Sequence, residues 1–124
     1  MEERHFMLLT MLKSKVHRVT VIEASLQYVG SLTLDPLLME AAQMGANERV
    51  QELNVNTGSR IETYLIEGER GSGIACLNGP AARSGQVGDI IIALTYCQMT
   101  PEEAKAHTPI VVHVDANNHI VEVV

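Results

Sequence analysis

Short runs of β-branched residues, separated by turn residues, constrain the fold of this chain more than any other feature. Such residues fit the pleated surface of a β-sheet, whereas Gly, Asn, Asp and Pro favour the turns between strands. The clearest runs are Val16 to Ile22, Arg49 to Val55, Ile61 to Ile66, Ile90 to Tyr96 and Pro109 to Val114. Strands with turn signals at about 8–12-residue spacing predict a mainly β protein, either a small barrel or a sandwich.

Local signals predict two hairpins and a few short helices. Asn56 to Ser59 and Asp115 to Asn118 are the two hairpin turns. Asp35 before Pro36 predicts a capped helix that ends at Gly45. Two further helical turns are predicted, one after the capping box of Thr100 and Glu103 and one from Gly79 to Ala82.

The sequence has 124 residues, which is enough for one sizeable core, and we expect a single domain spanning residues 1–124. Hydrophobic residues make up 46% and charged residues 19%, a balance typical of a soluble globular protein. No apolar run approaches the roughly 20 residues of a membrane span. Met1 to His5 lacks the apolar core of a signal peptide. We therefore expect a cytoplasmic protein with no membrane partner.

The charge and the cysteine content argue against nucleic-acid-binding, disulfide-linked and metal-binding proteins. A net charge of −6 argues against a nucleic-acid partner, which would need a basic face. Cys76 and Cys97 lie inside apolar runs, which predicts reduced, buried thiols rather than a disulfide. A reactive cysteine is the less favoured alternative. No Cys/His set has the spacing of metal ligands, so we expect no metal.

The stretch SLQYVGSLTLD, from Ser25 to Asp35, reads as a strand interrupted by Gly30-Ser31. The simplest interpretation is a bulge or bend, because glycine weakens a strand interior. The second hypothesis is self-processing: with no Cβ at Gly30, Ser31 Oγ reaches the Gly30 carbonyl carbon and turns the amide into an ester. β-Elimination would leave dehydroalanine, and hydrolysis would yield a pyruvoyl group. A neutral serine needs a base or strain and an oxyanion stabiliser for this attack.

Four motifs occur along the chain in a recognisable order. They are K-x-H-R from Lys15, Y-x-G-S from Tyr28, R-x-x-T-Y from Arg60 and N-G-x-A-A from Asn78. Each is weak alone, but together, over about Met7 to Val114, they resemble the aspartate 1-decarboxylase family. These are pyruvoyl-dependent enzymes that make β-alanine for pantothenate.

The resemblance implies a fold, an assembly and a processing step. The fold is a six-stranded double-psi β-barrel with short helices, assembled as a homotetramer with active sites between neighbouring subunits. Cleavage at Gly30-Ser31 would give chains of residues 1–30 and 31–124, with Ser31 converted to the pyruvoyl cofactor. Some members of the family need an accessory acetyltransferase-like protein for this maturation.

On their own, the polar residues of these motifs have modest interpretations. Lys15 and His17 share a strand face and would form a solvated pair. Arg60 would be a surface charge, and Asn78-Gly79 would be turn chemistry. The resemblance implies a substrate site in which Lys15 and Arg60 bind carboxylates, His17 lies beside the pyruvoyl group, Asn78 hydrogen-bonds near it, and Gly79, Ala81 and Ala82 line the pocket.

Thr63 and Tyr64 are neighbours in a strand, so their side chains point to opposite faces in regular geometry. A core tyrosine is the simpler interpretation of Tyr64. By resemblance, Thr63 assists the acyl shift by hydrogen-bonding the Gly30 carbonyl, and Tyr64 is the proton donor to the carbon that loses carbon dioxide. Tyr28 belongs to the same pocket region.

The chain departs from the family pattern at two places. Pro80 stands where many members have alanine, which removes one backbone donor. Leu53 stands where some members have tryptophan. The role of residues 1–6 is not predicted.

The resemblance implies decarboxylation of L-aspartate to β-alanine and carbon dioxide, through a Schiff base between the substrate amine and the pyruvoyl ketone. Two alternatives stay open at the level of sequence. One is an unprocessed double-psi barrel that acts as a binding or assembly module. The other is a pyruvoyl decarboxylase with another amino-acid substrate.

Overall fold

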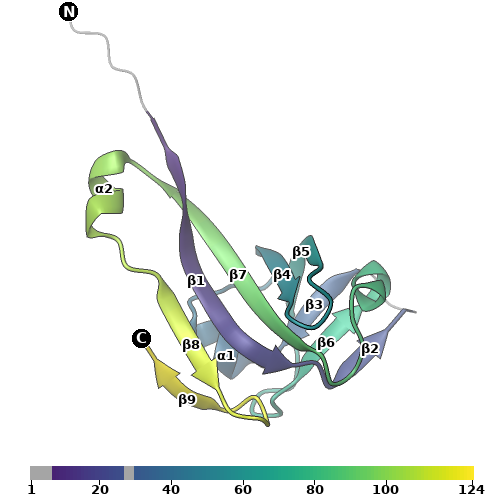
Figure 1. Cartoon of the computed structure of the whole chain (residues 1–124). Helices are drawn as coiled ribbons and strands as arrows, with labels where there is room; N and C mark the ends of the chain where they lie inside the picture. The colour runs from purple at the N-terminus through teal and green to yellow at the C-terminus, as the bar shows by residue number, and fades with distance from the viewer. Residues whose placement is uncertain (1–6, 27–29) are drawn as a thin grey trace, which may run out of the picture.

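The computed structural model describes residues 7–26 and 30–124, and most of these residues lie in strands or the turns between them (Figure 1). The described strands are β1 (Leu9–Thr20), β2 (Glu23–Ser25), β3 (Ser31–Leu34), β4 (Arg49–Asn54), β5 (Arg60–Glu67), β6 (Ala75–Asn78), β7 (Ile90–Met99), β8 (Ile110–Val114) and β9 (Ile120–Val123). The helices are α1 (Pro36–Ala41), α2 (Pro101–Ala106) and the 3₁₀ helix η1 (Gly79–Arg83). The prediction of a mainly β fold with short helices is confirmed.

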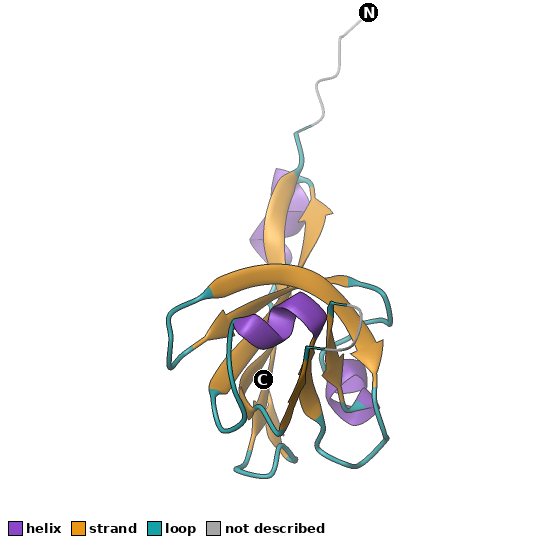
Figure 2. Ribbon diagram, turned by 90° about the vertical axis from the view of Figure 1, so that its right-hand side faces the viewer, coloured by secondary structure: helices purple, strands orange, loops and turns teal. Residues whose placement is uncertain are grey.

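The strands hydrogen-bond in the order β2-β6-β3-β5-β4-β7-β1-β8-β9. The long strands β1 and β7 run antiparallel through the middle, and the sheet curves so that its strands surround a common interior (Figure 2). Within the described ranges there are nine strands in an open order, with β2 and β9 at its ends, where the resemblance implies six. Part of this difference is that short ladders, such as that of the three-residue β2, form strands of their own.

Both predicted hairpins are present. β4 pairs with β5 in antiparallel fashion, and β8 pairs with β9 in the same way. In the first turn, Asn54 Oδ1 accepts hydrogen bonds from the backbone N–H groups of Asn56 (2.8 Å) and Thr57 (3.0 Å). Gly58 then takes a φ of +79°, which a glycine adopts at little cost.

The strand predicted across Ser25 to Asp35 is not continuous in the described residues, because Ser25 ends β2 and a separate strand, β3, runs over Ser31–Leu34. β3 begins only at Ser31, Gly30 lies in a bend, and Leu26 lies in a turn. Residues 27–29, which include Tyr28, lie outside the described residues. Asn78 of β6 pairs with Ser25 at the end of β2 and with Ser31 at the start of β3, so these two strands lie on opposite sides of β6. The bend at Gly30 is compatible with both interpretations of the Gly30-Ser31 step.

The helix caps follow the prediction, with one difference in length. Thr100 and Glu103 form the capping box of α2. Asp35 caps α1, which ends at Ala41 rather than at Gly45. The helix ends early because Gln43 takes a positive φ of 55°, and Met44 N then donates to Met39 O at 2.8 Å, closing the last turn.

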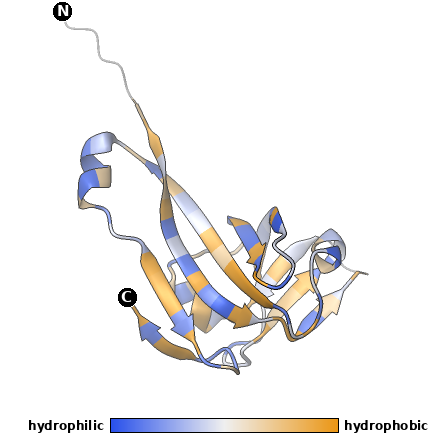
Figure 3. Ribbon diagram, in the orientation of Figure 1, coloured by the Kyte–Doolittle hydropathy of each residue, from blue (hydrophilic) through white to orange (hydrophobic). Residues whose placement is uncertain are grey.

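The core is aliphatic, as a chain with one phenylalanine and no tryptophan requires. Leu32, Leu34 and Leu65 are fully buried, and hydrophobic residues line the strands while α2 is largely hydrophilic (Figure 3). Cys76 is buried and Cys97 half-buried, and both are free thiols. The expectation of buried thiols thus holds for Cys76 and only in part for Cys97. No helix in residues 7–26 or 30–124 is long and apolar enough to cross a membrane.

Asp35 fastens α1 to the turn before β6. Its carboxylate accepts hydrogen bonds from the backbone N–H groups of Leu37, Gly71 and Gly73 at 2.9, 3.0 and 2.9 Å. Burial alone would raise the pKa of Asp35, but these three donors together hold it below its usual range.

We predict that Asp35→Ala lowers the free energy of unfolding by about 2–4 kcal/mol, since it removes a helix cap and leaves further N–H groups without their acceptor. The matched control is Thr100→Ala at the exposed cap of α2, which should cost about 1 kcal/mol. Denaturant unfolding followed by circular dichroism measures both. Equal losses in the two variants would contradict the role given to Asp35.

Candidate functional site

The Asn78 side chain joins β6 to β3 at the point where β3 begins. Its amide Nδ2 donates to Ser31 Oγ at 2.9 Å and to Thr33 Oγ1 at 2.7 Å. Ser31 is 0% exposed and Asn78 is 7% exposed. The Ser31 hydroxyl, the predicted nucleophile, is therefore held in a fixed position by a buried amide.

Cys76 fixes the orientation of that amide. Its thiol donates to Asn78 Oδ1 at 3.1 Å, so the carbonyl end of the amide faces the thiol and the NH₂ end faces the two hydroxyls. Burial raises the pKa of the Cys76 thiol to about 11, and the negative charge of Glu23 contributes to the same shift. The thiol thus keeps its proton at neutral pH and remains a donor.

Thr33 and Cys76 were not among the site residues predicted from the sequence. A signal for them exists, because Thr33 lies two positions after Ser31 and Cys76 two positions before Asn78. Side chains two apart in a strand share a face. Using this signal would have required knowing that β3 and β6 pair in the register Ser31↔Asn78.

A pocket of about 450 Å³ opens beside these residues. It is lined by Glu23, Ser31, Thr33, Ile66, Ile74, Cys76 and Asn78. Its walls combine apolar side chains with a few convergent polar groups, as is typical of small-molecule sites.

The turn η1 follows Asn78 directly and contacts the bend at Gly30. A Cβ placed on Gly30 would lie 3.0 Å from Pro80 Cδ, closer than ordinary contacts allow. Gly79 takes a positive φ of 57°, and Ala81 is buried. A side chain at position 30 would therefore crowd the ring of Pro80, the residue at which this chain departs from the family pattern.

Thr63 and Tyr64 lie near Ser31 along β5 and, as predicted, on opposite faces. Thr63 pairs with the buried Val50, and Tyr64 pairs with Arg49 on the exposed side. The parallel ladder between β3 and β5 begins at Leu32↔Leu65, so both residues immediately precede it. They therefore lie at the same end of the sheet as Ser31.

Arg60 is the centre of a polar group on the outer face of the sheet. Its guanidinium Nη1 donates to Gln51 Oε1 at 2.6 Å, and the Tyr96 hydroxyl donates to the same oxygen at 2.9 Å. Lys15 and Gln51 both pair with Leu94 of β7, which puts Lys15 on this face too. Gln51 and Tyr96 were missed in the sequence because neither belongs to a motif.

Lys15 and His17 line a second pocket, of about 280 Å³, together with Val111, His113 and Val124. The rings of His17 and His113 are in edge contact, with centroids 5.4 Å apart. Burial, followed by the positive charges of Lys15, His113 and Arg18, lowers the pKa of His17, so its ring is neutral at pH 7. This pocket shares no lining residue with the Ser31 pocket.

Comparisons with known proteins agree on one family. The family model for aspartate decarboxylase matches residues 7–121. The aspartate 1-decarboxylase of Caldicellulosiruptor saccharolyticus is 60% identical over 116 residues, covering 94% of this chain and 91% of the relative. That of Clostridium kluyveri is 55% identical, covering 94% and 92%. That of Listeria monocytogenes is 56% identical, covering 90% and 87%.

The chain belongs to the aspartate decarboxylase family. The resemblance inferred from the four motifs is confirmed, and the matched region contains every candidate residue named above. Residues 1–6 lie outside that region.

For this member of the family we predict that Cys76 resists alkylation in the folded protein, because burial raises its thiol pKa to about 11 and the thiolate is the reactive form. Iodoacetamide at pH 8 should modify Cys97 first, as intact mass spectrometry of native protein would show. A Cys97→Ser variant should then react only after denaturation. Rapid native labelling of that variant would contradict the protected donor role of Cys76.

Proposed function

We propose that the protein is an aspartate 1-decarboxylase that converts L-aspartate to β-alanine and carbon dioxide after cleaving itself between Gly30 and Ser31. The observation that carries this proposal is the Ser31 hydroxyl, held by Asn78 at 2.9 Å directly after a bend at Gly30. Family membership, with relatives 55–60% identical over most of the chain, points to the same activity.

In the cleavage step, Ser31 Oγ attacks the Gly30 carbonyl carbon. A C–O ester bond forms, the Gly30–Ser31 C–N bond breaks, and the hydroxyl proton ends on the Ser31 nitrogen. Loss of the Cα proton then expels the Gly30 carboxylate, and hydrolysis of the resulting dehydroalanine releases ammonia. Thr63, at the same end of the sheet, would donate to the developing oxyanion. The products are chains of residues 1–30 and 31–124.

The surroundings of Ser31 suit the covalent pyruvoyl group that would replace it. The pocket of about 450 Å³ leaves room for a small substrate beside it, and the Asn78 amide supplies a donor at its edge. The group supplies an electron sink for decarboxylation. It is made from the chain itself, so the proposal requires no separately bound cofactor.

The chain's own residues would position the substrate and move the proton. Arg60 suits a substrate carboxylate because its planar guanidinium matches two oxygens. Lys15 would bind the second carboxylate, with the neutral ring of His17 beside it. Tyr64 would donate a proton to the carbon that loses carbon dioxide. Backbone atoms of η1, from Gly79 to Ala82, would line the substrate pocket.

A homotetramer with sites between subunits belongs to the same proposal. Lys15 and His17 line a different pocket from Ser31, and four strands separate β1 from β6 in the sheet order. A complete site would therefore take Ser31 from one copy and Lys15 with His17 from a neighbour. We propose further that each copy is a single six-stranded double-psi β-barrel domain in the cytoplasm, supplying β-alanine to pantothenate and coenzyme A synthesis.

The cleavage is tested by intact mass spectrometry of purified protein before and after prolonged warming. We expect two chains that divide between residues 30 and 31, the larger one carrying the pyruvoyl modification. Ser31→Ala should remain full-length, and Ser59→Ala, in another Gly-Ser step, should process normally. A wild-type chain that stays at full-length mass would favour the unprocessed binding module, unless an acetyltransferase-like maturation factor restores cleavage.

The substrate is tested by product formation. We expect β-alanine from L-aspartate and no decarboxylation of L-glutamate by the processed protein. Arg60→Lys should lower kcat/KM about 10–100-fold, because an ammonium cannot make the bidentate contact, while cleavage at Ser31 proceeds. Turnover of glutamate in preference to aspartate would indicate a related decarboxylase with another substrate.

A further inference from the structure

We propose that Glu52 acts in its neutral acid form as a positioning residue, holding the turn η1 in place through Ser84. Nothing in the family motifs points to Glu52. The inference rests on the proposed function in one respect, since η1 lines the substrate pocket there.

Glu52 is a carboxyl group inside the core. It is 0% exposed, and on β4 it pairs with Ile61 of β5 and Ala93 of β7. Its Oε1 is buried and has no hydrogen-bond partner among residues 7–26 and 30–124, and its Oε2 lies 3.2 Å from Ser84 Oγ. A carboxylate in this place would lack the donors that make a buried charge tolerable.

Counting hydrogens at Ser84 shows which group donates. The Ser84 hydroxyl has one hydrogen and two acceptors within reach, Ala81 O at 2.7 Å and Glu52 Oε2 at 3.2 Å. The shorter distance is the usual one for an O–H···O bond, so the hydrogen belongs to the bond with Ala81. Ser84 Oγ then faces Glu52 with a lone pair, and only a protonated Glu52 completes that contact.

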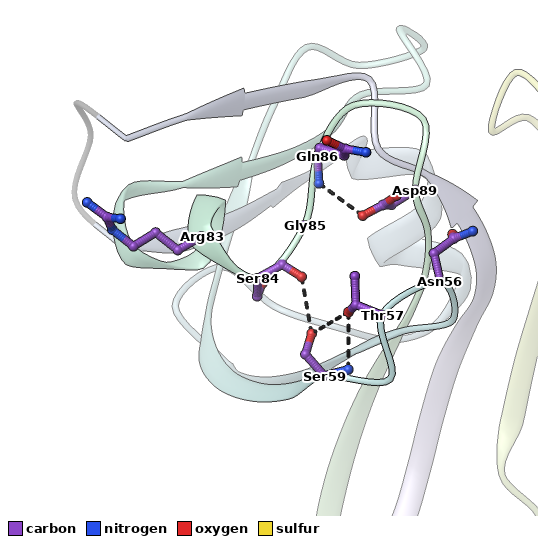
Figure 4. A pocket seen from close by; sticks show the side chains of 8 residues that line it. All are labelled: Asn56, Thr57, Ser59, Arg83, Ser84, Gly85, Gln86 and Asp89. Atoms are coloured by element: carbon purple, nitrogen blue, oxygen red, sulfur yellow. Dashed lines mark hydrogen bonds between the residues drawn. The ribbon is translucent and has the colours of Figure 1, made fainter.

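Ser84 is the junction between η1 and the β4–β5 hairpin. Its backbone N–H donates to Ala81 O at 3.0 Å, and its carbonyl accepts from Asn54 Nδ2 (3.2 Å) and Ser59 Oγ (3.1 Å). Figure 4 shows the Ser59 contact, with Ser84 above the hairpin turn. The Ser84 hydroxyl thus binds Ala81, and the Ser84 carbonyl binds the hairpin, so a movement of Ser84 would change the hydrogen bonds of both.

The charges around Glu52 favour the same protonation state. Asp89, buried nearby, accepts from Asn54 Nδ2 at 2.9 Å and from Gln86 N at 3.0 Å. Among the ion pairs of the described residues none includes Glu52, and the Arg83 side chain points away from Asp89 in Figure 4. Burial raises the pKa of Glu52 to about 7, and the negative charge of Asp89 contributes to the same shift.

Ionisation of Glu52 would change the hydrogen bond that Ser84 makes. The new carboxylate would take the Ser84 hydrogen, and Ala81 O would keep only the Ser84 N–H. The pKa of Glu52 is raised by folding, so the acid form adds to the stability of the folded protein. This stabilisation is complete below pH 4.5, the ordinary pKa of a glutamate, and is lost as pH rises through about 7. The turn is therefore held at acidic to neutral pH and loosened above it.

The protonation state is tested without any activity, by NMR titration of glutamate side-chain carboxyl signals. The Glu52 signal is identified by its absence in Glu52→Gln. We expect it to titrate near pH 7 in the wild type, and amide hydrogen exchange at Ser84 to rise across the same range relative to Glu52→Gln. Titration near the ordinary value of 4.5 overturns the proposal.

The positioning role is tested by the pH profile of aspartate decarboxylation. A group with a pKa near 7 goes from about nine-tenths protonated at pH 6 to about one-tenth at pH 8. If only the acid form of Glu52 supports the reaction, kcat/KM should fall up to about ninefold between these two pH values. Glu52→Gln keeps a neutral donor to Ser84 and should lack that loss, as should Ser84→Ala at a lower overall rate. Glu69→Gln, an exposed control, should keep the wild-type profile.

The two proposals fail in distinguishable ways. A wild-type protein that makes no β-alanine overturns the proposed function, and the NMR and exchange measurements still decide the state of Glu52. An active protein in which Glu52→Gln keeps the full wild-type pH profile overturns the positioning role.

Discussion

The hydrogen bonds of the Asn78 amide are the interactions on which the rest of the site depends. They form only because β3 and β6 pair in the register Ser31↔Asn78. A slip of one residue would turn Asn78 to the other face of the sheet and leave the Ser31 hydroxyl facing an apolar side chain. The register is itself secured by buried residues on both strands, among them Leu32 and Leu77, which pair directly. The aliphatic core thus sets the geometry of the polar group at its edge.

Local features of the fold were predictable from the sequence, and long-range ones were not. The helix caps at Asp35 and Thr100 involve only residues a few positions away, so a short stretch of sequence is enough to predict them. The close contact between Gly30 and Pro80 depends on where two distant segments meet, and so do the roles of Thr33 and Cys76. The break in the strand predicted through Gly30 has the same origin, since Asn78 of β6 pairs with Ser25 of β2 on one side and with Ser31 of β3 on the other.

The motif residues fall into two separate groups in one copy of the chain. Ser31 and Asn78 lie together in one pocket, while Lys15 and His17 lie with His113 in another. Motif order along a sequence carries no information about this separation, because it follows from the order of strands in the sheet. The proposed function needs cations near the reacting carbon of an anionic substrate, and the proposed assembly meets this need by placing one copy's Lys15 and His17 beside another's Ser31 pocket.

The five-residue turn η1 connects the processing end of the site to the buried carboxyl of Glu52. Its Pro80 contacts the bend at Gly30, and its Ala81 carbonyl receives the Ser84 hydroxyl that Glu52 in turn contacts. An apolar residue in place of Glu52 would cost less to bury, but it would give Ser84 no donor. The acid therefore makes sense as part of a polar network whose other end is the turn beside Ser31. Because that turn is short and contacts both Glu52's partner Ser84 and the bend at Gly30, we propose that a proton gained or lost at Glu52 changes the hydrogen bonds of the backbone near Ser31.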